Sequence, residues 1–267
     1  MNLFNILSDI EKIDVDANER YTFTRRKMLK TTTIAAAATS TLFAGVVNKA
    51  FAATPEINEV LNFALLLEYL EAEFYTKGIN SGLNFGISKG LFEEIAKHEN
   101  QHVALLKSAL GAAAIAKPVF DFTAKGAFPD PFTNYPVFLT LAQAFEDTGV
   151  RAYKGQAPKL ASNRDILETA LRIHSVEARH AGEIRLVREL TPYANEGNNG
   201  SGNGGVPAAV YAGENNIYHM NGIDLISLTT PKFLDSMRAE KVVRESFDEP
   251  LTKEQVTAIA MPFIKSM

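Results

Sequence analysis

The chain has no cysteine among its 267 residues. This absence excludes thiolate metal ligands, a cysteine nucleophile and the disulfide framework of a small secreted domain. An excess of one sign of charge is also missing, because 27 Lys and Arg face 31 Asp and Glu, so the composition does not favour binding to nucleic acid. With 46% hydrophobic residues, the sequence instead predicts a globular protein with a sizeable core.

The sequence also lacks a hydrophobic run of the roughly 20 residues that span a bilayer. Residues 34–47 are apolar or small, but they cover only about 14 positions. Arg25 and Arg26 precede this run, and Ala50-Phe51-Ala52 offers a cleavage site after it. Residues 1–52 therefore resemble a bacterial twin-arginine export signal. We expect a periplasmic or extracellular protein without stable membrane insertion once the signal is cleaved.

Cap and breaker residues divide the following sequence into four long helices, each with apolar residues at helical spacing. Thr54 and Pro55 form a typical helix start, and Gly78 falls where the first pattern stops. The other three helices are expected at residues 88–111, 134–157 and 162–190. The sequence therefore predicts an all-α fold.

The connection between the second and third helices, residues 112–133, is much longer than the other two and contains three prolines. About 22 extended residues reach roughly 70 Å, whereas a helix of about 23 residues is about 35 Å long. The connection can therefore run the length of a bundle and start the third helix parallel to the second. Two antiparallel helix pairs joined by a long crossover form a ferritin-like four-helix bundle.

The last part of the chain is expected to form a helical and loop appendage that packs on the bundle. It begins with NEGNNGSGNGG, residues 195–205, whose glycines and asparagines favour a surface loop. Two shorter helices are expected at residues 231–243 and 253–265, the second opened by the capping-box pair Thr252 and Gln255. The predicted organisation is a signal at 1–52, a bundle at 53–192 and an appendage at 193–267.

The helices contain an internal repeat at an offset of 78 residues. Three pairs of identical polar residues are separated by this offset. Identical apolar residues and tyrosines are separated by the same offset, and they lie on the same helical face as the polar residues. Because that face is otherwise apolar, we expect it to point into the core and to carry the polar residues with it. The polar pairs are Glu68 and Glu146, Glu99 and Glu177, and His102 and His180.

The four Glu residues of this repeat lie near the middle of their helices, so an antiparallel bundle brings their carboxylates to one level of the core. Unpaired charge there costs several kcal/mol per ion. Two divalent cations would neutralise four carboxylates, and the imidazoles would fill further coordination positions. Oxygen and nitrogen ligands without sulfur favour iron or manganese, so we expect two iron or two manganese ions as cofactors.

This set of residues resembles the ferritin-like di-iron and di-manganese carboxylate proteins, which use one Glu from each of two helices and Glu-x-x-His from the other two. The resemblance implies that each metal has its own Glu and His, and that the other two Glu residues bridge the metals. The first pair is Glu68 and His102, the second is Glu146 and His180, and the bridging residues are Glu99 and Glu177.

Two further stretches, LNFALLLEYLEAEFY and SFDEPLTKEQVTAIAMPFI, resemble the exported branch of this superfamily, which is similar to plant desiccation-related proteins. The resemblance implies redox chemistry on a small oxidant, dioxygen or hydrogen peroxide, with manganese-catalase-like activity as the most specific version. A non-catalytic stress or desiccation protein with a structural metal site is the alternative. Iron storage fits less well because of the long appendage. A homo-oligomer is possible in each case.

The stretch from His98 to His102 also matches the zinc-peptidase pattern H-E-x-x-H. A zinc peptidase needs both imidazoles as ligands and leaves Glu99 free as a general base. The second copy of the repeat has Val176 at the position of His98, and no third-ligand motif follows His102. We therefore interpret the zinc-peptidase match as coincidental.

Two other histidines flank the repeated residues. His98 is about 100° around the helix from Glu99, so we expect it at the exposed surface. His174 lies on the inner face of its helix, where it either bonds beside the cluster or packs in the core. His219 lies outside the repeat and has no assigned role.

Two tyrosines and two further Glu residues also lie close to the cluster in sequence. Tyr75 and Tyr153 either relay electrons or are core tyrosines with a bonded hydroxyl. Glu71 and Glu73 are expected to be solvated or to lie just behind the metal ligands.

Overall fold

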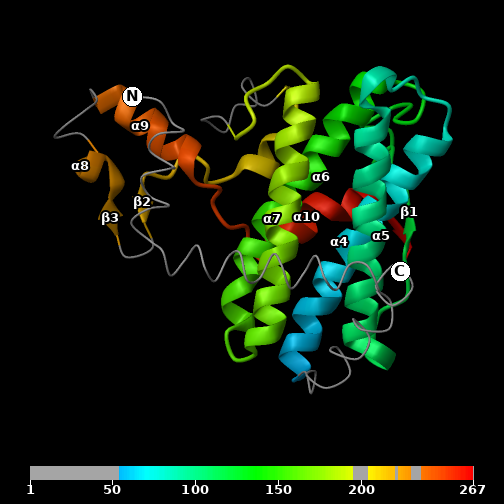
Figure 1. Cartoon of the computed structure of the whole chain (residues 1–267), viewed down its shortest axis with the longest axis horizontal. Coiled ribbons are helices and arrows are strands. Elements are labelled where there is room, and N and C mark those ends of the chain that lie inside the picture. The colour runs from blue at the N-terminus through cyan, green and yellow to red at the C-terminus, as the bar shows by residue number, and fades with distance from the viewer. Residues whose placement is uncertain (1–53, 195–203, 220–221, 230–235, 267) are drawn as a thin grey trace, which may run out of the picture. The chain divides into compact units, whose positions relative to one another are not determined.

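The computed structural model describes residues 54–194, 204–219, 222–229 and 236–266. The expected export signal lies outside these residues, as do residues 195–203 of the Gly- and Asn-rich segment. Four long helices form the body of the described chain (Figure 1). They are α4 (Pro55–Asn80), α5 (Lys89–Leu110), α6 (Tyr135–Gln156) and α7 (Arg164–Val187).

The four helices are arranged as two antiparallel pairs, α4 with α5 and α6 with α7. In Figure 1, α4 and α7 run in one direction and α5 and α6 run in the other. The long connection after α5 therefore returns the chain to the end at which α5 began, and α6 starts there. The predicted all-α bundle with a long crossover is confirmed.

Side-chain caps explain where three of these helices begin. The side chains of Thr54, Asn134 and Asn163 each accept a hydrogen bond from the backbone N–H three residues later. For α7 the cap is thus Asn163, one residue after the predicted start. Short 3₁₀ helices lie beside the long ones: η1 (Gly86–Ser88), η2 (Gly111–Ala113) and η3 (Ala157–Leu160).

The predicted end of the first helix at Gly78 is wrong, because α4 continues to Asn80. Gly78 is instead a point of close packing. A Cβ at this position would lie 2.3 Å from Cε2 of Phe138. The Phe138 ring in turn stacks on Phe74, with ring centroids 4.6 Å apart, in an aromatic core between α4 and α6. The glycine therefore serves the contact between two helices and does not stop the first one.

The C-terminal end of the chain is tied to the crossover by a short antiparallel pairing. Strand β1 (Val119–Phe120) lies in the crossover and pairs with β4 (Ile264–Ser266). The predicted helix at 253–265 is correct at its start but ends early, as α10 (Lys253–Ala260), followed by η5 (Met261–Phe263). Pro262 lacks an N–H and so cannot continue the helix.

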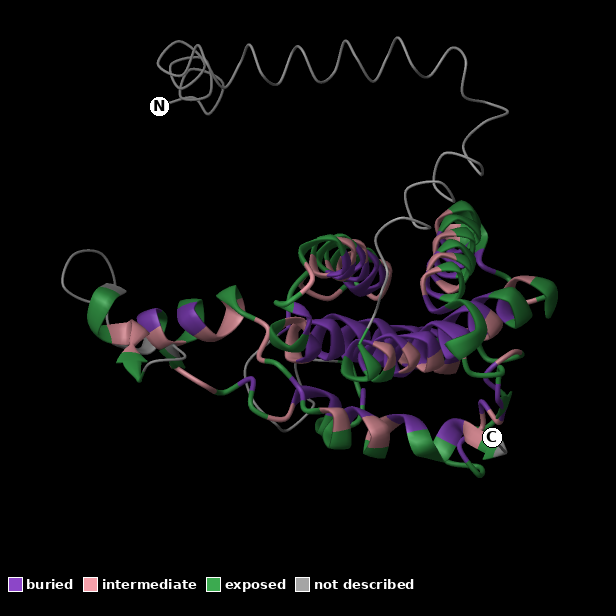
Figure 2. Cartoon of the chain, turned by 90° about the horizontal axis from the view of Figure 1, so that it is seen from below, coloured by how far each residue is buried: buried purple, intermediate pink, exposed green. Residues whose placement is uncertain are grey.

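Helices α4 and α6 form the inner layer of the bundle. Both bury most of their residues, whereas α5 and α7 bury only one face (Figure 2). The reason is that α10 and the residues before it cover the side of α4 and α6 that α5 and α7 leave open. Val256 and Ala260 of α10 pack with Phe63, Leu67 and Ala152 of the inner helices.

A buried arginine fastens the appendage to the bundle. Arg151 of α6 donates hydrogen bonds to the backbone carbonyls of Val210 and Ala212, and it forms an ion pair with Glu214 at 2.9 Å. Val210 belongs to η4 (Ala208–Tyr211). A charged group that is almost fully buried needs such partners. Arg151 finds them only when the appendage is docked on α6, so it stabilises the docked position.

The remaining described elements are short. Helix α9 (Ser236–Ser246) stands where the sequence predicted a helix at 231–243, and residues 231–235 lie outside the described residues. The others are β2 (Tyr218–His219), β3 (Ile223–Asp224), which pairs antiparallel with β2, and α8 (Leu225–Thr229). Within the described ranges, every helix is too short or too polar to cross a membrane.

The close approach of the appendage to α6 leads to a first prediction. A Cβ at Gly155 would lie 2.0 Å from the carbonyl oxygen of Leu251, a backbone atom that cannot rotate away. Gly155→Ala should therefore lower the free energy of unfolding by about 1–3 kcal/mol. Gly90→Ala in α5 is the matched control, because nothing lies within 4 Å of its Cβ position. Thermal unfolding followed by circular dichroism measures both, and equal stability of the two variants would contradict the docked position of Leu251.

Candidate metal centre

Six polar side chains meet inside the bundle. They come from all four long helices, and none has more than 8% of its surface exposed. Their oxygen and nitrogen atoms form two overlapping groups, in each of which the donor atoms lie within 4.8 Å of one another. These residues are Glu68, Glu99, His102, Glu146, Glu177 and His180.

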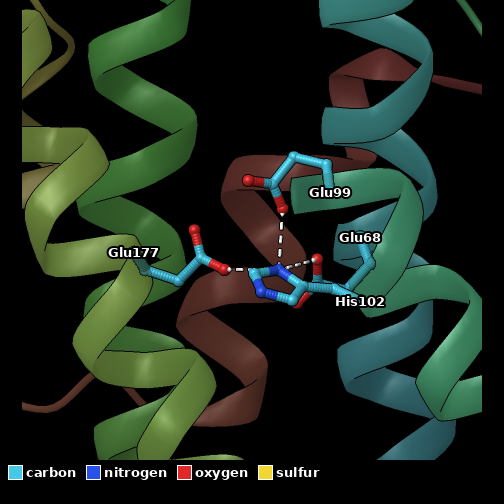
Figure 3. A group of neighbouring side chains, drawn as sticks. All are labelled: Glu68, Glu99, His102 and Glu177. Atoms are coloured by element: carbon cyan, nitrogen blue, oxygen red, sulfur yellow. Dashed lines mark hydrogen bonds and ion pairs between the residues drawn. The ribbon is translucent and has the colours of Figure 1, made fainter. Parts of the chain in front are cut away.

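The first group surrounds Nδ1 of His102 (Figure 3). Three carboxylate oxygens from three helices face this nitrogen. They are Oε2 of Glu68 at 3.2 Å, Oε2 of Glu99 at 3.0 Å and Oε1 of Glu177 at 3.1 Å. His102 and Glu99 are one turn apart on α5, so the Glu-x-x-His spacing delivers a nitrogen and an oxygen from one helix.

The second group repeats this arrangement around Nδ1 of His180. The surrounding oxygens are Oε1 of Glu99 at 2.9 Å, Oε2 of Glu146 at 3.2 Å and Oε2 of Glu177 at 3.5 Å. Here Glu177 and His180 form the Glu-x-x-His turn on α7, and Glu146 comes from α6. The two groups are therefore related by the offset of 78 residues that the sequence contains.

Glu99 and Glu177 are shared between the two groups. Each directs one carboxylate oxygen toward His102 and the other toward His180. Glu68 and Glu146 each contact only one of the two imidazoles. The side chains thus present two neighbouring positions, each bounded by one nitrogen and three oxygens, with two carboxylates common to both.

The cluster contains more acceptors than donors. Nδ1 of each imidazole lies near three carboxylate oxygens. This nitrogen can carry only one hydrogen, which cannot point at all three oxygens. Oε1 of Glu99 and both oxygens of Glu177 are buried without a hydrogen bond of normal geometry. Buried oxygens without donors are costly. Oxygen and imidazole donors around two closely spaced points fit divalent iron or manganese, so the residues suit such a pair of ions.

Protons can partly offset the negative charge of the cluster. Burial raises the pKa of Glu146 to about 8, against the attraction of His180. Burial likewise raises the pKa of Glu99 to about 7, although hydrogen bonds from His102 and His180 oppose it. Glu68 differs: burial raises its pKa most strongly, but attraction to His102 together with hydrogen bonds from His102, Glu99 and Tyr153 outweighs the burial and holds the pKa below the ordinary value.

The two imidazoles respond in the opposite sense to burial. Burial disfavours their charged form, but the adjacent carboxylates outweigh it, so the pKa of both His102 and His180 lies above its ordinary value. Glu99, Glu146 and the two imidazoles of the metal-free cluster therefore favour bound protons, which bound cations would displace.

Two tyrosines support the carboxylates that are not shared. Tyr75 of α4 donates a hydrogen bond to Oε1 of Glu146 at 2.6 Å, and Tyr153 of α6 donates to Oε1 of Glu68 at 2.5 Å. Each tyrosine thus reaches across to the opposite helix of the inner pair. Both hydroxyls form hydrogen bonds, as expected of core tyrosines. The second oxygen of each carboxylate remains directed into the cluster.

Glu71 is a fifth carboxyl beside the cluster. It is 3% exposed, which contradicts the solvated alternative. Burial, followed by repulsion from Glu177 and Glu146, raises its pKa well above the ordinary value. Its counterpart in the repeat is Gly149, and a Cβ there would lie 3.3 Å from Oε1 of Glu71. The missing side chain in one copy makes room for the extra carboxyl in the other, and the alignment of the repeat could have revealed it.

Glu73, the other flanking carboxylate, lies near the surface and forms ion pairs with Lys77 at 2.7 Å and Lys117 at 2.6 Å. Glu73 is not one of the positions that the internal repeat shares between its two copies.

The expectation that His98 lies at the exposed surface needs correction. His98 is only partly exposed, and its ring lies edge to edge with that of His180, with centroids 5.2 Å apart. Nδ1 of His98 lies 2.9 Å from Nε2 of His180. His174 does not belong to either donor group of the described chain. Burial lowers its pKa, and the charges that influence this pKa are those of Asp248 and Lys154. Sequence spacing placed His98 correctly on α5 but could not show that α7 lies beside it.

The zinc-peptidase pattern receives no support from this geometry. His98 and His102 do not share a donor group among the described residues. Glu99, which a peptidase would need as a free base, lies inside the cluster between both imidazoles.

The raised pKa values predict how the metal-free protein responds to pH. A carboxyl with a raised pKa in the folded state contributes stability below its unfolded pKa and loses it as pH rises through the folded value. Glu99 and Glu146, at about 7 and about 8, both act in this direction, and so do the two imidazoles. In the presence of a chelator, the melting temperature should therefore fall between about pH 5 and about pH 9.

Glu146→Gln should reduce this slope, whereas Glu73→Gln, at an ion-paired position near the surface, should leave it unchanged. A melting temperature that stays constant or rises over this range in the wild-type protein would contradict the protonated state of the cluster.

The comparison with known families agrees with the fold. Residues 57–189 match the family described as the ferritin-like domain. This range includes all four long helices almost completely and all six residues of the cluster. No curated protein matches the chain significantly. The chain therefore contains a domain of the ferritin-like superfamily, formed by residues 57–189.

Proposed function

We propose that the cluster binds two iron or two manganese ions and that the protein carries out redox chemistry on dioxygen or hydrogen peroxide. The main support is the division of Glu99 and Glu177, each of which offers one oxygen to each of two adjacent donor groups. This is the arrangement expected of bridging carboxylates. In this proposal Glu68 and His102 bind one ion, and Glu146 and His180 bind the other.

When bound, two such ions would together supply the two-electron change that the reduction of an O–O bond requires. The residues of the chain position the donors and control protons and water. The hydroxyls of Tyr75 and Tyr153 orient the carboxylates of Glu146 and Glu68. Glu71 lies next to the cluster, where burial and repulsion from Glu177 and Glu146 raise its pKa and favour its protonated form.

The two faces of the bundle differ in access to the cluster. On the side of α10, the cavity between Glu71 and Ile259 measures about 10 Å³, barely the size needed for one water molecule. On the other side, a groove of about 710 Å³ lies between α5 and α7, and His180 is part of its lining. A small oxidant would therefore reach the cluster from the side of α5 and α7.

Metal analysis combined with two oxygen measurements tests the proposal. The protein produced with manganese should contain about two ions per chain and convert hydrogen peroxide into dioxygen and water, one peroxide being oxidised and another reduced. The ferrous form should instead consume dioxygen as its iron is oxidised. Glu99→Gln removes one shared carboxylate, so it should lose most of both ions and both reactions. Glu73→Gln should retain them.

Two bound ions with neither reaction would overturn the redox function and favour a non-catalytic protein with a structural metal site. Failure of the wild-type protein to bind either metal would overturn the centre itself.

We also propose that the protein is exported by the twin-arginine route. The support is the sequence of residues 1–52, with Arg25 and Arg26 before a short apolar run. A pathway for folded proteins would allow the centre to be assembled before transport. Replacement of both arginines by lysine should leave the full-length protein in the cytoplasm, detected by cell fractionation and immunoblotting. Unchanged export of this variant would contradict the proposed route.

A further inference from the structure

The two imidazoles of the cluster have different surroundings on the side that faces away from the carboxylates. Nε2 of His180 lies 2.9 Å from Nδ1 of His98, and the two rings are nearly parallel, at 13°. His98 in turn has its Nε2 3.3 Å from Oε1 of Glu94, one turn earlier on α5. A chain of polar contacts therefore leads from His180 through His98 to a carboxylate at the surface.

This contact sets the orientation of the His180 ring. A neutral imidazole has one N–H and one lone pair, and the partner of one nitrogen decides which of them the other nitrogen presents. If Nε2 of the neutral His180 ring donates to His98, then Nδ1 presents its lone pair to the space between the three carboxylates, where a metal ion would bind. The same donor sequence lets His98 donate from Nε2 to Glu94.

The repeat does not supply an equivalent partner for His102. The residue that corresponds to His98 at the offset of 78 is Val176. A valine side chain has no atom that can accept or donate a hydrogen bond. The two halves of the cluster, otherwise related by the repeat, therefore differ in how their imidazoles are held.

We propose that His98 is a positioning residue for the half of the centre formed by His180 and Glu146, and that the two metal positions consequently differ in affinity. This inference rests on the proposed dinuclear centre. Partners of metal-binding histidines typically change metal affinity by 10- to 100-fold, and the position at His180 should depend on His98 to about that extent. The position at His102 should not.

The groove between α5 and α7 makes the role of His98 directly testable. His98 lines this groove together with His180, and about a third of its side chain is exposed. Removal of the ring leaves a space that opens to solvent, so free imidazole can enter it. A residue needed only for packing would not be replaced in this way.

The experiment is a titration of the metal-free, full-length mature protein with Mn²⁺ by calorimetry. The wild-type protein should bind two ions. His98→Ala should bind one ion with unchanged affinity and the other about 10- to 100-fold more weakly. Added imidazole should restore the weakened step in this variant without changing the wild-type titration. His98→Gln, which keeps an acceptor oxygen, should be weakened less than His98→Ala.

His174→Ala is the matched control, because His174 is a partly buried histidine on α7 outside both donor groups. It should titrate as the wild-type protein does. Normal binding of two ions by His98→Ala, equal weakening of both ions, or no effect of imidazole on this variant would overturn the role of His98 while leaving the dinuclear centre intact. If the wild-type protein bound no metal, the proposed centre would fall, and the role of His98 with it.

Discussion

Four fully buried carboxylates at one level of a helical bundle are the constraint on which the rest of this structure depends. In the described chain, each of their ion pairs is with one of two imidazoles. Such a cluster is unfavourable unless protons or cations neutralise it. Protons are one way to neutralise the cluster, as the raised pKa values of Glu99 and Glu146 indicate. A pair of divalent cations is the other way. Metal binding, proton release and stability of the bundle are consequently linked.

The repeat at an offset of 78 residues builds this cluster with near symmetry, and two positions at which its copies differ lie on opposite faces. Glu71 faces Gly149 on the side of α10, where the space is closed. His98, which corresponds to Val176, lies in the groove between α5 and α7. A symmetric pair of donor groups thus acquires an extra carboxyl on its closed side and an extra imidazole on its open side. These two differences give the halves of the centre distinct chemical surroundings.

The appendage explains why the inner helices are buried on nearly all sides. In an isolated four-helix bundle, one face of α4 and α6 would meet water. Here α10 covers that face with Val256 and Ala260, and Arg151 holds the preceding segment through buried hydrogen bonds. The pairing of β4 with β1 connects the chain end to the crossover. The appendage therefore excludes water from one side of the cluster.

The sequence by itself determined the helical class, the long crossover and the six residues that converge, because helix periodicity and the repeat are local properties of the chain. The tertiary structure alone decided the rest. Gly78 does not end its helix, and its missing side chain leaves room for the Phe138 ring of another helix. His98 meets His180 rather than solvent, because α7 lies next to α5. Contacts between separate helices depend on how their faces pack, and no spacing within one helix records that.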